Sequence, residues 1–167
     1  MKVGYKDYKD FLRKVKEEIT QRGKDNILSI VLYGSVARNK AKPESDIDIL
    51  ILCKKRNSNV ENLILKGISS VRKFPEYEKL HKRKLYGEIS PFIVGINELK
   101  ENPLILLDII EDGVILYQKD KVFERILKKF KEKLKKLKSK KVYLPDGTWY
   151  WDLKPDWKPG EEVEIKL

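Results

Sequence analysis

Apolar side chains recur at helical spacing in several stretches of the chain. Between residues 5 and 19 they fall at steps of three and four, which predicts an amphipathic helix that ends at Gly23. Asn97 is expected to cap a later helix, and Gly113 to end it. The same spacing predicts helices over residues 60–72, 76–84, 98–111 and 121–138.

Runs of β-branched and other apolar residues, bounded by turn residues, predict strands. Residues 27–33 and 46–52 are expected to form two buried strands. Residues 88–96 predict a third strand, in which Pro91 indicates an edge position or a bulge. Residues 114–117 predict a short fourth strand. The pattern therefore predicts a mixed α/β (α+β) fold, with a mixed sheet of three to four strands flanked by helices.

The C-terminal part of the chain differs in composition. Lysine dominates residues 128–141, and the turn residues 145–147 separate two β-prone stretches, which predicts a hairpin. We expect a core domain over residues 1–118 and, packed on it, a C-terminal extension of helix and hairpin over residues 119–167. The tryptophans of this extension are expected to pack the hairpin onto the core rather than to stack bases.

Length and composition limit the class of protein. The 167 residues suffice for one core and are too few for two full-sized domains. The apolar runs are far shorter than the roughly 18 residues of a membrane span. The only cysteine, Cys53, lies in an apolar run, which excludes an internal disulfide and a cysteine metal cluster. The N-terminal residues alternate with charge and form no apolar signal segment. We expect a cytoplasmic protein that does not contact a membrane.

The balance of charge admits two interpretations. The 37 Lys and Arg residues outnumber the 26 Asp and Glu residues, for a formal net charge of +11. A basic field of this kind attracts nucleotides and nucleic acids. Abundant lysine together with abundant acid is equally typical of a thermophilic protein surface. The sequence leaves both explanations open.

Two aspartates at the start of the second predicted strand form a candidate metal site. Side chains at positions i and i+2 of a strand point to the same face, roughly 7 Å apart. Asp46 and Asp48 therefore present two carboxylates in one direction. Hard oxygen ligands of this kind suit Mg²⁺, which shares its remaining coordination positions with water and substrate phosphates.

Gly34 and Ser35 form a candidate phosphate cradle. They lie where the first predicted strand gives way to a short helical segment, predicted over residues 36–41. Backbone N–H groups at such a junction are free to hold an anion, glycine allows a close approach, and serine adds a hydroxyl donor. A phosphate cradle beside paired carboxylates is the minimum equipment for phosphoryl transfer, although each motif alone is more often a turn or a solvated strand start.

Residues 32–52, LYGSVARNKAKPESDIDILIL, resemble the signature of the DNA polymerase β-type nucleotidyltransferase superfamily. The resemblance is to its minimal, single-domain archaeal and bacterial members. The shared pattern is Gly-Ser, ten residues, then Asp-x-Asp. The order of predicted elements over residues 5–117 is also similar to the family's nucleotidyltransferase fold. Asn39 departs from the glycine that many members have after an Ala-Arg pair.

The resemblance implies roles for individual residues. Asp46 and Asp48 match the family's metal ligands, for two Mg²⁺ ions with Mn²⁺ as a substitute, and Gly34 and Ser35 match its triphosphate contacts. A third acid normally comes from a later strand. Glu88 is the best match, where the family more often has Asp, and its implied role is to bind the catalytic metal and help deprotonate the attacking hydroxyl. The alternative for Glu88 is an exposed strand entrance without a catalytic role.

The resemblance also implies a reaction. An enzyme of this kind transfers a nucleoside monophosphate from an NTP, ATP being the first choice, to an acceptor hydroxyl on a partner protein such as a helical toxin, or on RNA. Arg38 follows the cradle and is expected either to contact phosphates or to be solvated surface. The alternative function is a catalytically inactive module that binds RNA or protein through the lysine-rich helix and the aromatic tail.

Overall fold

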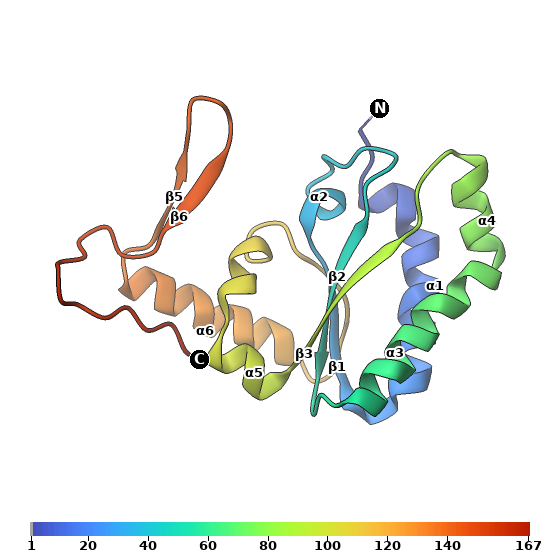
Figure 1. Cartoon of the computed structure of the whole chain (residues 1–167), viewed down its shortest axis with the longest axis horizontal. Helices are drawn as coiled ribbons and strands as arrows, with labels where there is room; N and C mark the ends of the chain where they lie inside the picture. The colour runs from blue at the N-terminus through green and yellow to red at the C-terminus, as the bar shows by residue number, and fades with distance from the viewer. Residues whose placement is uncertain (1) are drawn as a thin grey trace.

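The computed structural model of the protein describes residues 2–167 (Figure 1). The helices are α1 (Tyr5–Gly23), α2 (Gly34–Ala37), α3 (Ser58–Ser70), α4 (Pro75–Lys82), α5 (Ile96–Glu101) and α6 (Val122–Lys136). Three 3₁₀ turns join them: η1 (Lys24–Asn26), η2 (Val71–Lys73) and η3 (Leu104–Asp108). The strands are β1 (Ile27–Leu32), β2 (Ile47–Cys53), β3 (Ile89–Gly95), β4 (Val114–Gln118), β5 (Lys140–Tyr143) and β6 (Trp149–Asp152).

The centre of the fold is a four-stranded mixed sheet in the order β3-β2-β1-β4. β1 pairs antiparallel with β2 and β4, whereas β2 and β3 are parallel. Helices α1, α3 and α4 cover one face, and α5, η3 and α6 cover the other (Figure 1). The predicted fold class, a mixed sheet of three to four strands flanked by helices, is confirmed.

Residues of β2 alternate between the two faces. Ile47, Ile49 and Ile51 belong to the core beneath α1 and α3, whereas Leu50 and Leu52 belong to the core beneath α6. Both faces of this strand are covered, and its apolar residues are fully buried. This explains why the strand has a continuous apolar run in the sequence.

The third strand is an edge strand, as Pro91 predicted. The N–H of Ile47 donates to the carbonyl of Glu88 at 2.9 Å. In a parallel pair this register turns the backbone nitrogen of Pro91 away from β2, toward the open edge of the sheet. Proline therefore removes no ladder hydrogen bond, and it makes the edge less able to pair with another strand.

Two predicted helices are wrong in extent. The helix expected over 98–111 is α5, which ends at Glu101, followed by the separate turn η3. Pro103 disfavours helical geometry at Asn102, whose backbone is extended (φ −133°, ψ 81°). The cap is Gly95, whose N–H donates to Glu98 Oε2 at 2.9 Å, and not Asn97.

The second correction concerns the segment expected to be helical over 36–41. It is the single turn α2, which begins at Gly34 and ends at Ala37. Asn39 has a left-handed backbone conformation (φ +55°) that stops the helix. Ala41 then forms an isolated antiparallel bridge with Val3, so the N-terminal segment holds the loop that follows α2.

The C-terminal part of the chain adds a helix and a hairpin. Helix α6 buries four apolar residues against the sheet: Phe123, Ile126, Phe130 and Leu134. The predicted hairpin is confirmed as β5 and β6, a separate two-stranded sheet that stands away from the main sheet at one end of the molecule (Figure 1). Across residues 2–167, every helix is too short or too polar to cross a membrane.

Candidate active site

The candidate active site lies where β1 ends and β2 begins. These strands run antiparallel, with Leu32 opposite Ile49, and the N–H of Tyr33 donates to the carbonyl of Asp48 at 3.0 Å. The chain leaves β1 at Gly34, so the turn into α2 begins directly beside Asp48. The sheet therefore brings together the two motifs that are ten residues apart in the sequence.

Gly34 can be replaced by no other residue without strain. Its φ is +73°, in the left-handed region. A Cβ added there would overlap a carboxylate oxygen of Asp48 and lie 3.1 Å from its Cγ. Two independent constraints, backbone conformation and close approach, thus require glycine at this point. Because Gly34 has no side chain, the turn lies directly against the Asp48 carboxylate.

Helix α2 is a single turn that places Ser35 and Arg38 at the site. The N–H of Arg38 donates to the carbonyl of Gly34 at 3.2 Å, and the N–H of Lys40 donates to the carbonyl of Ser35 at 2.9 Å. Both Ser35 and Arg38 are half-buried. Within the described residues 2–167, no side chain caps the N-terminus of α2. The N–H groups of this first turn are therefore available to an anion.

The two aspartates interact electrostatically. Asp46 is exposed and Asp48 is half-buried at the start of β2. Burial raises the pKa of Asp48, and the negative charge of Asp46 raises it further. Hydrogen bonding by Ser90 and the positive charge of Arg38 lower the pKa and partly offset this rise. Crowded carboxylates of this kind are a suitable site for a cation.

Glu88 lies apart from the aspartate pair. Its carboxylate accepts hydrogen bonds from Arg72 Nη2 at 2.5 Å and from the Tyr77 hydroxyl at 3.2 Å. These partners belong to η2 and α4, on the face of the sheet opposite α6. The β3 residue beside Asp48 is Ser90. In the part of the chain that the structure describes, no three His, Cys, Asp or Glu side chains are grouped to hold a metal ion.

The position of Glu88 has a physical reason. The carbonyl of Glu88 accepts from the N–H of Ile47 beside β2, and the Glu88 side chain is held by Arg72. The guanidinium of Arg72 supplies an opposite charge nearby, and the hydrogen bond from Arg72 to Glu88 raises the pKa of Arg72. The structure thus brings Gly34 and Asp48 together, and the metal-binding role of Glu88 stays a prediction.

Two residues near the site were not found from the sequence. The negative charge of Asp108, at the end of η3, contributes to the raised pKa of Asp48. Burial raises the pKa of Tyr33, and the charges of Asp48 and Asp108 raise it further. The sequence predicted a continuous helix over 98–111, whereas the structure has α5 and the separate turn η3, which ends at Asp108. The Asn102-Pro103 pair was the available signal for the break.

A family model described as "Polymerase beta, Nucleotidyltransferase" matches residues 13–122, which include the whole β1–α2–β2 unit. The match spans well over half of the chain. This protein belongs to the polymerase β nucleotidyltransferase family. The predicted family is confirmed, and nucleotidyl transfer is the general reaction of the family.

The chain is also similar to individual proteins. A Methanocaldococcus jannaschii protein, named as a candidate protein adenylyltransferase, is 29% identical over 140 residues, which cover 77% of this chain and 82% of that protein. The chain is also similar to solved structures. One is a toxin–antitoxin complex with AMP-PNP (TM-score 0.49, 14% identity, 75% of this chain and 89% of that one). Another is a Shewanella oneidensis MNT antitoxin with AMPylated HEPN toxin (TM-score 0.44, 15% identity, 77% and 88%).

Cys53 and His81 are the only cysteine and the only histidine of the chain. Cys53 is fully buried at the end of β2, and burial raises the pKa of its thiol to about 11. A thiol in this environment is not ionised near neutral pH and acts as a small core residue. His81 is exposed on α4, and its ring packs edge-on against Tyr77 with 4.6 Å between centroids.

Proposed function

We propose that this family member transfers a nucleoside monophosphate from an NTP, ATP being the first choice, to an acceptor hydroxyl, and that the reaction needs Mg²⁺. The observation that carries the proposal is the junction of β1, α2 and β2. There, a turn without a side-chain cap lies against the carboxylate of Asp48, whose neighbour Asp46 adds a second negative charge, and a Cβ at Gly34 would overlap the Asp48 carboxylate. This is a site for a phosphate and a cation side by side.

The donor set fits Mg²⁺. Asp46 and Asp48 offer hard carboxylate oxygens. Burial raises the pKa of Asp48, the charge of Asp46 raises it further, and a bound cation would relieve the repulsion between the two carboxylates. By family resemblance these aspartates would hold two Mg²⁺ ions, with Mn²⁺ as a substitute. A bound Mg²⁺ would neutralise negative charge on the phosphates during transfer.

The other residues of the site bind and orient the nucleotide. The first N–H groups of α2 and the Ser35 hydroxyl would donate to phosphate oxygens, and Arg38 would add positive charge. The acceptor oxygen then attacks the α-phosphorus, and the bond from that phosphorus to the bridging β-oxygen breaks. Pyrophosphate leaves with the bonding electrons, and the hydroxyl proton passes to a carboxylate and on to solvent.

Two carboxylates are candidates for accepting that proton. Glu88 is the candidate from family resemblance, and it would have to leave Arg72 to reach the aspartates. Asp108 is the candidate from the structure, because its charge already acts on Asp48. Comparison of Glu88→Gln with Asp108→Asn distinguishes them. The essential acid is the one whose loss lowers turnover by about 100-fold or more while nucleotide affinity is retained.

We favour a hydroxyl of a partner protein as the acceptor. The Methanocaldococcus jannaschii relative supports this choice, since its name assigns protein adenylylation. An RNA hydroxyl is the second candidate for the acceptor. A catalytically inactive binding module is the second candidate for the function, and it is favoured by Ser90 beside Asp48 and by the pairing of Glu88 with Arg72.

Calorimetric titration of ATP in the presence and absence of Mg²⁺ tests the nucleotide site. The double variant Asp46→Ala/Asp48→Ala should lose Mg²⁺-dependent binding, by about 100-fold or more, and remain folded. The matched control is Asp10→Ala/Asp25→Ala, which removes two exposed acids on α1 and η1 and should bind as the wild type does. Unchanged ATP binding in the Asp46/Asp48 variant would refute the metal site.

Transfer itself is tested by incubating the protein with each α-labelled NTP and Mg²⁺ in an extract of the cells that express it. A labelled protein band that disappears in the Asp46/Asp48 variant supports the proposed reaction and identifies the acceptor. ATP binding without labelling of any protein or RNA would favour the inactive binding module.

A further inference from the structure

The exposed face of α6 carries a large excess of positive over negative charge. Within residues 2–167, the exposed lysines of α6 that are named below have no carboxylate within 4.0 Å. Only two acids, Glu124 and Glu132, interrupt the face, and Glu124 is hydrogen-bonded with Gln118. The exposed, unpaired lysines of the helix are Lys128, Lys129, Lys131, Lys135 and Lys136.

Adaptation to heat does not account for this pattern. Ion pairs are the means by which charged surfaces stabilise thermophilic proteins. Helix α1 has this arrangement, with Glu17 bonded to Arg13 and Lys14, and Glu18 bonded to Arg22. Helix α6 has repulsive lysines at spacings of three and four residues, which destabilise a helix slightly. An anionic partner would relieve this repulsion.

Exposed aromatic rings continue the surface beyond α6. Tyr143 and Tyr150 on the hairpin are 66% and 49% exposed, and Trp157 is 52% exposed. The prediction that the tryptophans pack on the core holds for Trp151, which contacts the core beneath α6, and is wrong for Trp157. Exposed rings of this size on a short hairpin cost hydration free energy unless a ligand covers them.

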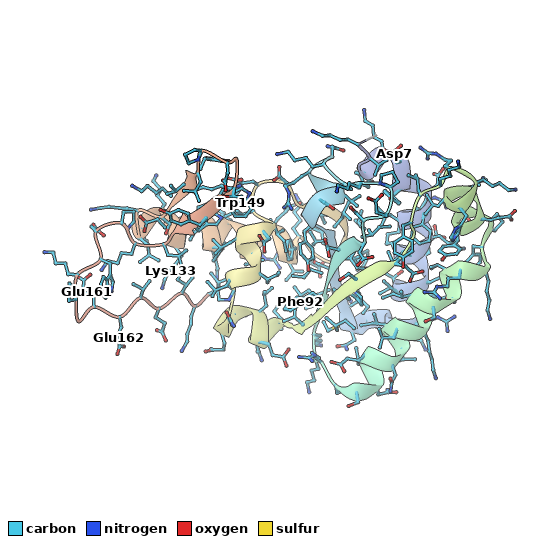
Figure 2. The ribbon with its side chains drawn as sticks, turned by 45° about the horizontal axis from the view of Figure 1, so that its top comes forward. Asp7, Phe92, Lys133, Trp149, Glu161 and Glu162 are labelled. Carbon is cyan, nitrogen blue, oxygen red and sulfur yellow. The ribbon has the colours of Figure 1, made fainter. Side chains whose placement is uncertain are left out.

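The lysines and the rings lie at the same end of the molecule, with Tyr143 and Tyr150 on opposite faces of the hairpin because their cross-strand partners are Trp149 and Val142. β5 follows α6 after three residues, and the Ser139 hydroxyl donates to the carbonyl of Leu153 at 2.5 Å across the base of the hairpin. Lys141 Nζ lies 4.0 Å from the centroid of the Trp149 ring and also bonds to Glu111. Figures 1 and 2 show the hairpin and α6 together at the end of the molecule away from α3 and α4.

We propose that the lysine face of α6 and the aromatic hairpin bind single-stranded nucleic acid. The lysines would follow the phosphates, and the exposed rings of Tyr143, Tyr150 and Trp157 would stack on unpaired bases. A duplex offers no free base faces to these rings. An anionic membrane would require apolar side chains among the lysines, and the exposed face of α6, as described, has only charged residues. The proposal does not depend on nucleotidyl transfer.

Fluorescence anisotropy of the full chain with labelled oligo-rU and oligo-dT, of about 15 nucleotides, tests this surface without NTP or Mg²⁺. The variant Lys128→Gln/Lys131→Gln/Lys135→Gln should bind about tenfold more weakly. The slope of log affinity against log salt should fall by about 2, since three phosphate contacts are lost.

The matched control is Lys66→Gln/Lys73→Gln/Lys79→Gln. It removes the same charge from exposed lysines on α3, η2 and α4, far from α6, and should bind within about twofold of the wild type. Equal weakening in the two triple variants would overturn the proposal, because net charge alone would then explain binding. Failure of the wild type to bind either oligonucleotide would also overturn it.

The aromatic contribution is tested separately. Tyr143→Ala/Tyr150→Ala should lower affinity about tenfold or more without changing the salt slope, whereas Tyr143→Phe/Tyr150→Phe should bind as the wild type does. Both side chains are exposed, so thermal unfolding should be unchanged. Undiminished binding by the alanine variant, or equal affinity for a duplex of the same length, would refute recognition of unpaired bases.

Discussion

At the scale of single residues, the Asp48 side chain suits the binding of a cation but lowers the stability of the fold. The side chain is half-buried beside Gly34, in a space that its carboxylate fills. Burial raises its pKa, and the charge of Asp46 raises it further. The ionised carboxylate is therefore less stable in the folded chain than in the unfolded chain. This destabilisation is expected at a site that binds a cation.

We expect Asp48→Asn to stabilise the protein at neutral pH. A raised pKa in the folded state means that the folded protein binds the proton more tightly, so the wild type loses stability as pH rises above the ordinary Asp pKa of 3.8. Asparagine does not ionise and therefore removes this loss. Urea unfolding at about pH 7 should show the gain, and at about pH 3 the difference should vanish.

The exposed residue Asp10 provides the control for this experiment. Asp10→Asn should leave the free energy of unfolding unchanged at both pH values, because Asp10 is solvated on α1. If Asp48→Asn lowered the free energy of unfolding at neutral pH, the ionised Asp48 side chain would not be destabilising the fold.

At the scale of elements, the active site depends on one strand-to-helix turn. β1 ends at Leu32, α2 begins at Gly34, and the hydrogen bond from Tyr33 to Asp48 holds this junction to β2. The bridge between Val3 and Ala41 holds the loop after α2 from the other side. A change in the turn therefore acts on fold and function together.

We expect Gly34→Ala to lower the free energy of unfolding by about 2–3 kcal/mol and to abolish Mg²⁺-dependent ATP binding. The positive φ accounts for about 1 kcal/mol, and the overlap with Asp48 for the rest. Gly147→Ala is a matched control, since its φ is +83° and no described atom lies within 4 Å of the added Cβ. Gly147→Ala should lose only the stability that depends on the positive φ, and it should bind ATP normally. Urea unfolding measures the free energy of unfolding, and calorimetry measures ATP binding.

At the scale of the whole molecule, α6 is part of the core rather than an appendage. Its four buried apolar residues pack with Val31 and Leu50 on the second face of the sheet. Burial of four such side chains is worth roughly 6–12 kcal/mol, which is similar to the entire stability of a small domain. The predicted boundary between a core over 1–118 and an extension over 119–167 would separate this helix from the sheet that it covers.

We therefore expect a fragment of residues 1–118 to be unfolded or aggregated, and a fragment of residues 1–139 to fold. The longer fragment keeps α6 and loses only the hairpin and the contacts of residues such as Trp151 and Ile165. Circular dichroism and amide chemical-shift dispersion of the two fragments measure the difference. A cooperatively folded 1–118 fragment would show that the core domain is independent.

The sequence alone predicted the elements and motifs that depend on residues close together in the chain. The strands β1, β2 and β4, the helices α1, α3 and α6, and the hairpin all follow from the spacing of apolar residues and from turn residues. The pairing of Gly34 with Asp48 was also predictable, because Gly34 follows one predicted strand, Asp48 lies in the next, and consecutive strands usually pair. Pro91 correctly indicated the edge of the sheet.

Only the tertiary structure decided which other side chains approach this motif. The sequence does not reveal the partners of Glu88 and Asp108: Arg72 pairs with Glu88, and the charge of Asp108 acts on Asp48. The physical reason is the range of the interactions. Local spacing determines elements and their adjacent motifs, whereas the partner of a charge depends on how distant elements pack against one sheet.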